Sequence, residues 1–408
     1  MAAIPHHAPT QDPPIVNLHP VIQKLESEMT AWRRRLHARP ELGFEETETA
    51  RFVGDKLRSF GIETTEGIGR TGVVGTLNGR LGAGETLGLR ADMDALPMQE
   101  ARPLPHASTS PGRMHACGHD GHVATLLGAA AALARAPDFA GTVRFIFQPA
   151  EEGLGGALAM LDDALFDRFP CDRIFAFHNS ERPLGQVVVY HNVVAAAADR
   201  FKVTIRGRGG HAATPHFAID PIPIAARILL AIEALPGRMT EAASPAVVTV
   251  GAIHAGDAFN IIPDTATMIG TVRCFDEQVR ATLEASIKRI TEGEATLYGA
   301  SAEVAYQTLF AVSVNDAEQA RRLGNAAAEV VGADRIVWNP APELGSEDFS
   351  FMLQRRPGCY FLIGQGDSEH GAVCHDTQYD FNDRILAIGA SIWVRLVERE
   401  LAPPGPSS

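Results

Sequence analysis

The feature that most constrains the fold is an alternation of short apolar strands and amphipathic helices, which stops near Ala195 and resumes after Gln307. Before the interruption the sequence predicts strands at 71–77, 86–89, 141–147 and 174–177. It predicts helices at 18–38 and 45–60, and a third that starts in the Cys/His-rich loop and continues over 128–136. Strands that alternate with helices at this interval are typical of an α/β domain with a mostly parallel sheet. We therefore expect such a sheet with helices on both faces.

The interrupting segment has a different order of elements. It predicts strand, helix, strand, strand, helix and strand, at 201–206, 219–235, 246–253, 266–275, 277–297 and 303–306. This βαββαβ order is the ferredoxin-like unit, which can fold as a compact domain. The first pattern then resumes with a helix at 316–331, a strand at 360–363 and a helix at 385–401. The sequence therefore predicts a discontinuous larger domain, residues 15–198 and 309–402, an inserted domain, residues 199–308, and flexible tails at 1–14 and 403–408.

Composition and charge exclude several classes of protein. The chain of 408 residues has 45% hydrophobic and 21% charged residues, which is typical of globular proteins. A formal charge of −13 argues against a nucleic-acid partner, because phosphate binding needs a basic face. No apolar segment is long enough to span a bilayer, and the first residues lack the features of a signal peptide. Five scattered cysteines favour reduced thiols, so we expect a cytoplasmic protein. Without a segment that could span a bilayer, we expect no membrane partner.

The segment Met114–Val123, MHACGHDGHV, is rich in potential metal ligands. It places Cys117, His119, Asp120 and His122 within six residues, ahead of an apolar helix. Thiolate and imidazole are the usual ligands of zinc and similar metals. The alternative is a polar loop in which Cys117 is a small buried apolar residue. The cluster indicates a metal site only if other parts of the chain supply further ligands.

Other polar residues follow predicted strands. Glu151 and Glu152 come after the strand that ends at Phe147, His178 comes after the strand that ends at Phe177, and His375 lies near the end of the chain. Taken singly, these would be a solvated acidic turn, a hydrogen-bonded core histidine and a surface histidine. Together with the Cys/His cluster they favour a metal site, because open α/β sheets place ligands beyond the ends of their strands.

Seven motifs occur in order along about 350 residues: RADMDALPMQE, MHACGHDGHVATLLGAA, FIFQPAEEG, FHN, GRGGHAATPH, NIIPD with GTVR, and GSEDFSFM. The chain resembles the aminoacylase/carboxypeptidase family of di-metal peptidases, in particular the branch of hippurate hydrolases and plant auxin–amino-acid conjugate hydrolases. The resemblance implies that the metal ligands are Cys117, His119, Glu152, His178 and His375. It also implies that Glu151 is the general base, and that Cys117 takes the bridging place that aspartate holds in the carboxypeptidase branch.

Other residues follow from the same resemblance. Where the carboxypeptidase branch has His-x-Asp, this chain has Asp92-Met-Asp94, so Asp92 is not assigned as a ligand. Asp94 and Asp120 are candidates for orienting the ligands. The family's inserted domain is a lid that also mediates dimerisation, so we expect a homodimer or a dimer-based homo-oligomer. On that domain the resemblance favours His211 as an oxyanion donor over a purely structural histidine, and Asn260 as a substrate contact.

The implied activity is metal-dependent amidohydrolysis, which cleaves N-acyl amino acids to a carboxylic acid and a free amino acid. Two divalent ions per chain are expected, zinc or manganese, with cobalt and nickel as alternatives. One alternative function is a dipeptidase or carboxypeptidase of the same family. Another is a non-catalytic metal-binding partner, which would have no use for Glu151. Relatives often carry Trp-Pro after His-Asn, and methionine at the position of Thr214, so the preferred acyl group and amino acid cannot be transferred.

Overall fold

The computed structural model describes residues 17–241, 244–366 and 373–403. The predicted tails lie outside these residues, apart from residue 403. The chain divides into two compact units, the first comprising Met1–Asn192, Asn315–Pro340 and Arg355–Ser408, the second Val193–Val314 and Ala341–Gln354. None of the helices in the described residues is long and apolar enough to cross a membrane.

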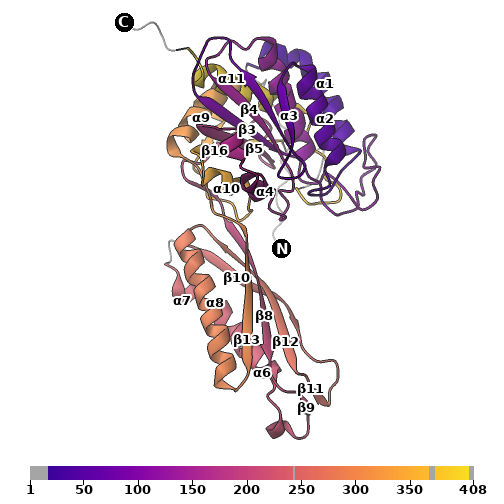
Figure 1. Cartoon of the computed structure of the whole chain (residues 1–408), viewed down its shortest axis with the longest axis vertical. Coiled ribbons are helices and arrows are strands. Elements are labelled where there is room, and N and C mark those ends of the chain that lie inside the picture. Colours follow the sequence, from indigo (N-terminus) through magenta and orange to yellow (C-terminus); the bar gives the residue numbers. More distant parts are fainter. Residues whose placement is uncertain (1–16, 242–243, 367–372, 404–408) are drawn as a thin grey trace, which may run out of the picture. The chain divides into compact units, whose positions relative to one another are not determined.

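The first unit contains one mixed sheet, in the order β1-β2-β4-β3-β5-β16-β6-β15. Figure 1 labels its central strands β4, β3, β5 and β16. Its strands are β1 (Glu63–Ile68), β2 (Gly72–Asn78), β3 (Thr86–Asp92), β4 (Thr142–Gln148), β5 (Arg173–Ser180), β6 (Val187–Val189), β15 (Ile336–Trp338) and β16 (Gly358–Gly364). The central strands β4, β3, β5 and β16 are parallel to one another, and so are β6 and β15. The predicted mostly parallel α/β class is confirmed. The sequence did not predict β1, whose residues are mainly polar and lack a buried face, or the three-residue strands β6 and β15.

Apolar side chains are buried on both faces of this sheet. Consecutive strand residues point to opposite faces. In β4, Phe145 and Phe147 belong to a core with five helices, whereas Ile146 between them is equally buried on the opposite face. The helices of that core are α1 (Pro20–His37), α2 (Thr47–Ser59), α3 (His119–Arg135), α9 (Ala317–Val331) and α11 (Arg384–Glu400). Two shorter helices lie between β4 and β5 in the chain, α4 (Gly156–Asp162) and α5 (Leu165–Arg168). Helix α4 contacts β4.

Strand β5 is longer than predicted. The sequence predicts a strand that ends at Phe177, with His178 and Asn179 beyond it. In the structure both residues lie within β5, because the parallel ladder with β16 continues until Ser180 pairs with Gly364. The two polar residues are therefore held by strand hydrogen bonds rather than by a loop.

The second unit contains the predicted βαββαβ fold. Its antiparallel sheet has the order β10-β12-β8-β13, from β8 (Ala197–Arg206), β10 (Ala246–His254), β12 (Thr265–Cys274) and β13 (Ser301–Phe310). Helices α6 (Pro221–Glu233) and α8 (Glu277–Leu297) share one apolar core with this sheet, so both cover the same face. The smaller elements of the unit are β7 (Val193–Ala195), β9 (Gly210–His211), β11 (Ile261–Ile262), β14 (Ser313–Val314), α7 (Pro236–Met239) and α10 (Phe349–Leu353).

A buried ionic network in the first unit joins α1 to the start of α3. His37 Nδ1 lies 2.8 Å from Asp120 Oδ2, and its Nε2 lies 3.3 Å from Glu100 Oε1. Arg33 donates to Asp380 at 2.7 Å, and its Nη1 lies 3.6 Å from Asp120 Oδ2. Burial disfavours the charged imidazole, but the hydrogen bonds to Asp120 and Glu100 raise the pKa of His37 to about 9. Asp120 directly follows His119, so this network fixes the first turn of α3.

We predict that His37→Gln lowers the stability of the first unit at pH 6.5 by on the order of 3 kcal/mol, because it breaks a buried ion pair. The pKa of His37 is higher in the folded state, about 9, than in the unfolded state, near 6.5. Protonation of His37 therefore stabilises the folded state fully below pH 6.5, and this contribution is lost as the pH rises towards 9. The difference between wild type and variant should therefore shrink over that range. Urea unfolding followed by tryptophan fluorescence measures it, since Trp32, Trp338 and Trp393 all belong to the first unit. A difference that stays constant with pH would mean that His37 acts only through packing.

Candidate metal centre

The Cys/His segment turns sharply at Gly118, directly before α3. Gly118 has φ 102°, a left-handed conformation that favours glycine. A Cβ atom there would lie 2.2 Å from Asn179 Oδ1 and 2.7 Å from the Tyr379 hydroxyl oxygen. Glycine is thus required both by the backbone angle and by the close approach of these side chains. The turn leaves Cys117 ahead of the helix and His119 in its first turn.

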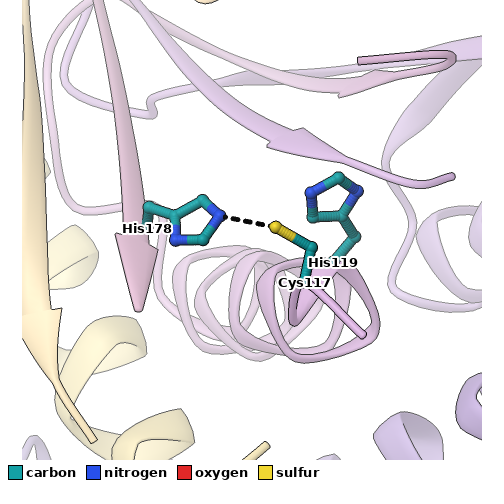
Figure 2. Close-up of side chains that lie close together, drawn as sticks. All are labelled: Cys117, His119 and His178. Atoms are coloured by element: carbon teal, nitrogen blue, oxygen red, sulfur yellow. Dashed lines mark hydrogen bonds between the residues drawn. The ribbon is translucent and has the colours of Figure 1, made fainter. Parts of the chain in front are cut away.

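Three potential ligands meet at this turn (Figure 2). Cys117 Sγ lies 3.2 Å from Nε2 of His178, which projects from β5. His178 Nδ1 lies 2.7 Å from the Asn179 carbonyl oxygen, and His119 Nδ1 lies 2.9 Å from the Asp94 carbonyl oxygen. Each Nδ1–H therefore donates to a carbonyl, which leaves the lone pair of the neutral ring on Nε2. This is the arrangement in which metal-binding histidines are usually held.

The environment of His119 Nε2 indicates whether the cluster suits a cation. It is buried and has no hydrogen-bond partner among the described residues. A buried polar atom without a partner is costly unless a ligand satisfies it. The ligand atoms of Cys117, His119 and His178 lie within 4.8 Å of one another. Two imidazoles and a thiol suit zinc and related divalent metals, so the residues fit a cation.

A second group shares Cys117 with the first. The ligand atoms of Cys117, Glu152 and His375 also lie within 4.8 Å of one another, and His375 Nε2 lies 3.2 Å from Glu152 Oε1. His375 has φ 69°, and its backbone N–H donates to the Ala116 carbonyl at 2.7 Å. The structure thus brings together all five residues predicted as ligands, in two groups with one thiol in common.

Asp94 orients the adjacent glutamates. Its Oδ1 accepts the backbone N–H of Glu151 at 3.0 Å, and its Oδ2 accepts that of Glu152 at 3.0 Å. Asp94 Oδ1 also lies 3.2 Å from His119 Nδ1. Glu151 is 6% exposed, and its carboxylate forms a further close group with His119 and Glu152. Asp94 therefore positions Glu151 beside two predicted ligands.

The electrostatics of the cluster favour a bound cation. Burial opposes a charge on His119, but the carboxylates of Asp92 and Asp94 raise its pKa well above the ordinary value. Burial likewise opposes a charge on Glu152, but His375 and His119 lower its pKa. The carboxylates thus create a negative potential that favours positive charge within the cluster. A bound metal ion would provide that charge in place of the protons on the histidines.

Another close group consists of Asp92, His119 and His122, and in it Asp92 and His122 already have protein partners. His122 Nδ1 lies 2.6 Å from Asp92 Oδ1, and its Nε2 lies 2.8 Å from Asn179 Oδ1. Arg90 Nη1 donates to the other oxygen of Asp92 at 2.8 Å. Both ring nitrogens of His122 are occupied, so this group supports the site and does not offer an open position.

Sequence reasoning did not identify the supporting role of Asn179. Besides its contact with His122, its Nδ2 donates to the Tyr379 hydroxyl at 2.9 Å and to Cys374 Sγ at 3.4 Å. The sequence offered one signal for these residues, which is that each is adjacent to a predicted ligand. Asn179 directly follows His178, and Cys374 directly precedes His375. Neither position indicated which side chains would meet.

His211 and Asn260 lie together in the second unit. His211 pairs with Ile261 across β9 and β11, and the Ala212 N–H donates to the Asn260 carbonyl at 3.1 Å. His211 is exposed, and its Nδ1 accepts the Ala213 N–H at 3.0 Å. The neutral ring therefore carries its proton on Nε2, which is left as the donor atom.

Comparison with known proteins gives consistent matches along the chain. The model of peptidase family M20/M25/M40 matches residues 88–399. Hippurate hydrolase of Campylobacter jejuni is 39% identical over 389 residues, covering 95% of this chain and 100% of that protein. The IAA-amino acid hydrolase ILR1-like 2 of Arabidopsis thaliana is 38% identical over 373 residues, covering 89% and 83%. The crystal structure of Bacillus subtilis YXEP, a dinuclear metal-binding peptidase from the M20 family, superposes with a TM-score of 0.78 and 33% identity, covering 93% of this chain and 99% of that one.

We predict that Cys117→Ala lowers the content of divalent metal at both positions together, because Cys117 belongs to both ligand groups. Elemental analysis after dialysis against metal-free buffer measures the ions retained per chain. The matched control is Cys171→Ala, which removes another buried thiol that belongs to neither group. Retention of one ion at the wild-type level by Cys117→Ala would contradict a shared thiolate.

Proposed function

The chain belongs to peptidase family M20/M25/M40 and is a metallohydrolase of that family, and from this premise we propose that it hydrolyses the amide bond of N-acyl amino acids. The products are a carboxylic acid and a free amino acid. The single observation that carries the proposal is the Glu151–Glu152 pair, which Asp94 holds through both backbone N–H groups beside a two-part cluster of ligand atoms. Similarity to two hydrolases of amino-acid conjugates supports this substrate class.

Five residues would hold two divalent ions: Cys117, His119, Glu152, His178 and His375. Divalent ions, when bound, supply Lewis acidity that polarises a carbonyl and lowers the pKa of water. We propose zinc or manganese, since the donor set combines thiolate, imidazole and carboxylate. Metal analysis of the purified protein and reactivation of the chelated protein by each ion in turn would identify the metal.

Glu151 is the proposed general base. It takes a proton from the attacking water and delivers it to the nitrogen of the leaving amine as the C–N bond breaks. The water oxygen remains on the acyl carbon, so the atoms balance as carboxylic acid plus amine. Glu151 suits this role because Asp94 accepts its backbone N–H and its carboxylate lies close to Glu152 and His119.

Residues 199–308, which belong to the second unit, are the proposed lid and dimerisation domain. Its His211 would donate Nε2–H to the oxyanion of the tetrahedral intermediate, and Asn260 would contact the substrate. Hydrogen bonding of Ala213 N–H to His211 Nδ1 supports the donor role, because it fixes the tautomer. Sedimentation of the full chain tests the proposed homodimer, and a monomer at all concentrations would rule it out.

A dipeptidase or carboxypeptidase of the same family is the alternative activity. Measuring kcat/KM for N-benzoylglycine, N-acetyl amino acids and unblocked dipeptides separates the two. N-acyl amino acids should give the higher kcat/KM, since none of the residues with a proposed role is assigned to bind a free α-amine. Higher kcat/KM for dipeptides would favour the alternative, and no turnover with any substrate and metal would favour a non-catalytic binding protein.

We predict that Glu151→Gln keeps its metal content and loses turnover by about 10²–10⁴-fold, since the amide keeps the shape of the side chain but removes its basicity. Steady-state rates and elemental analysis are measured on the same sample. Glu63→Gln, at an exposed position of β1, is the matched control and should keep the wild-type rate. Near-normal turnover by Glu151→Gln would remove Glu151 as the base.

We predict that His211→Ala lowers kcat by about 10²-fold, because one oxyanion donor is lost. Metal content and thermal stability should remain near the wild-type values, since the His211 side chain is exposed. His216→Ala removes another exposed histidine of the same unit and serves as the control. An equal effect of the two substitutions would argue against a specific role for His211.

A further inference from the structure

Two cysteine thiols meet at the edge of the candidate metal centre. Cys374 Sγ donates to the carbonyl oxygen of Cys117 at 3.6 Å, and each thiol is among the groups that shift the pKa of the other. The backbones are held side by side, because the N–H of His375, the next residue after Cys374, donates to the carbonyl of Ala116. Two cysteines 257 positions apart in the chain thus lie side by side, with the Cys374 sulfur against the backbone of Cys117.

The remaining three cysteines have different partners. The Sγ atoms of Cys171 and Cys274 contact the carbonyls of Phe169 and Asp276, and that of Cys359 contacts the carbonyl of Tyr360. These three side chains are buried, whereas Cys374 is partly exposed. Its neighbours Val373 and His375 are 49% and 54% exposed, so a small solute can reach Cys374 from solvent. Cys117 is buried, with 9% of its surface exposed.

We propose that Cys117 and Cys374 are an oxidisable pair, which a hydroperoxide closes to a disulfide that withdraws Cys117 from metal binding. The hydroperoxide first transfers an oxygen to the sulfur of Cys374, giving a sulfenic acid and an alcohol, or water from hydrogen peroxide. The sulfur of Cys117 then attacks the Cys374 sulfur and displaces water. In total, two thiols and one hydroperoxide give one disulfide, one alcohol and one water.

The consequence for metal binding rests on the proposed function, in which the Cys117 thiolate is common to both ions. A sulfur atom in a disulfide carries no negative charge and is a poor ligand, because the thiolate is the form that binds metals. Conversely, a bound ion would occupy the Cys117 sulfur and slow its attack on Cys374. The full chain should therefore be sensitive to oxidation after chelation and resistant when loaded with zinc.

The test treats the chelated and the zinc-loaded full chain with equimolar hydrogen peroxide. In the chelated protein, two of the five thiols should be lost, the intact mass should fall by about 2 Da, and peptide mapping should find residue 117 linked to residue 374. Zinc affinity, measured against a colorimetric chelator, should fall at least tenfold, and dithiothreitol should restore the thiols and the affinity. The zinc-loaded protein should keep its five thiols over the same time.

Two variants complete the test. Cys374→Ser should form no linked peptide and should keep its zinc affinity after a treatment that inactivates wild type, whereas Cys171→Ser should behave as wild type. A link that excludes residue 374, or equal loss of zinc affinity in Cys374→Ser, would overturn the proposed pair. A link between 117 and 374 with unchanged zinc affinity would instead overturn Cys117 as a ligand, so failure of the pair and failure of the metal assignment are distinguishable.

Discussion

The carboxylate of Asp94 holds three parts of the candidate site in register. One oxygen accepts the N–H of Glu151, the other accepts the N–H of Glu152, and the carbonyl and carboxylate oxygens lie within 3.2 Å of His119 Nδ1. A single side chain therefore links the loop after β4 to the start of α3. Because this carboxylate is 1% exposed, its hydrogen bonds act in a medium that screens them weakly. The separation between the proposed base and the proposed ligands depends on this one residue.

The parallel arrangement of β3, β4 and β5 makes that link possible. The carboxyl ends of neighbouring parallel strands meet at one edge of the sheet, where open α/β sheets place their sites. Here β3 ends at Asp92, β4 at Gln148 and β5 at Ser180. Arg90 of β3 donates to Gln148 of β4 at 2.8 Å and to Asp92, so the strand ends are also joined by side chains. The sheet thus supplies a rigid edge, and the short segments after it carry the reactive groups.

Buried polar contacts surround the site on several sides. Asn179 joins His122 to Tyr379, while His37 joins Asp120 to Glu100. Buried polar networks of this kind are stabilising only when their members are satisfied. His119 Nε2 and Glu152 Oε1, which both belong to the candidate cluster, are among the buried polar atoms of the described residues without a hydrogen-bond partner. A thiol pair at the same position would couple occupancy by metal to the redox state of the chain.

Local periodicity was enough to predict the α/β class and the inserted βαββαβ order, whereas the candidate ligands followed from the resemblance of short motifs to a known family. It did not determine where β5 ends, since the ladder between His178 and Leu362 is a pairing of distant segments. Nor did it determine that Asn179 supports His122, or that Cys374 meets Cys117. These contacts depend on the tertiary fold, because strand order and the return of the chain after β16 bring together residues that no local pattern relates.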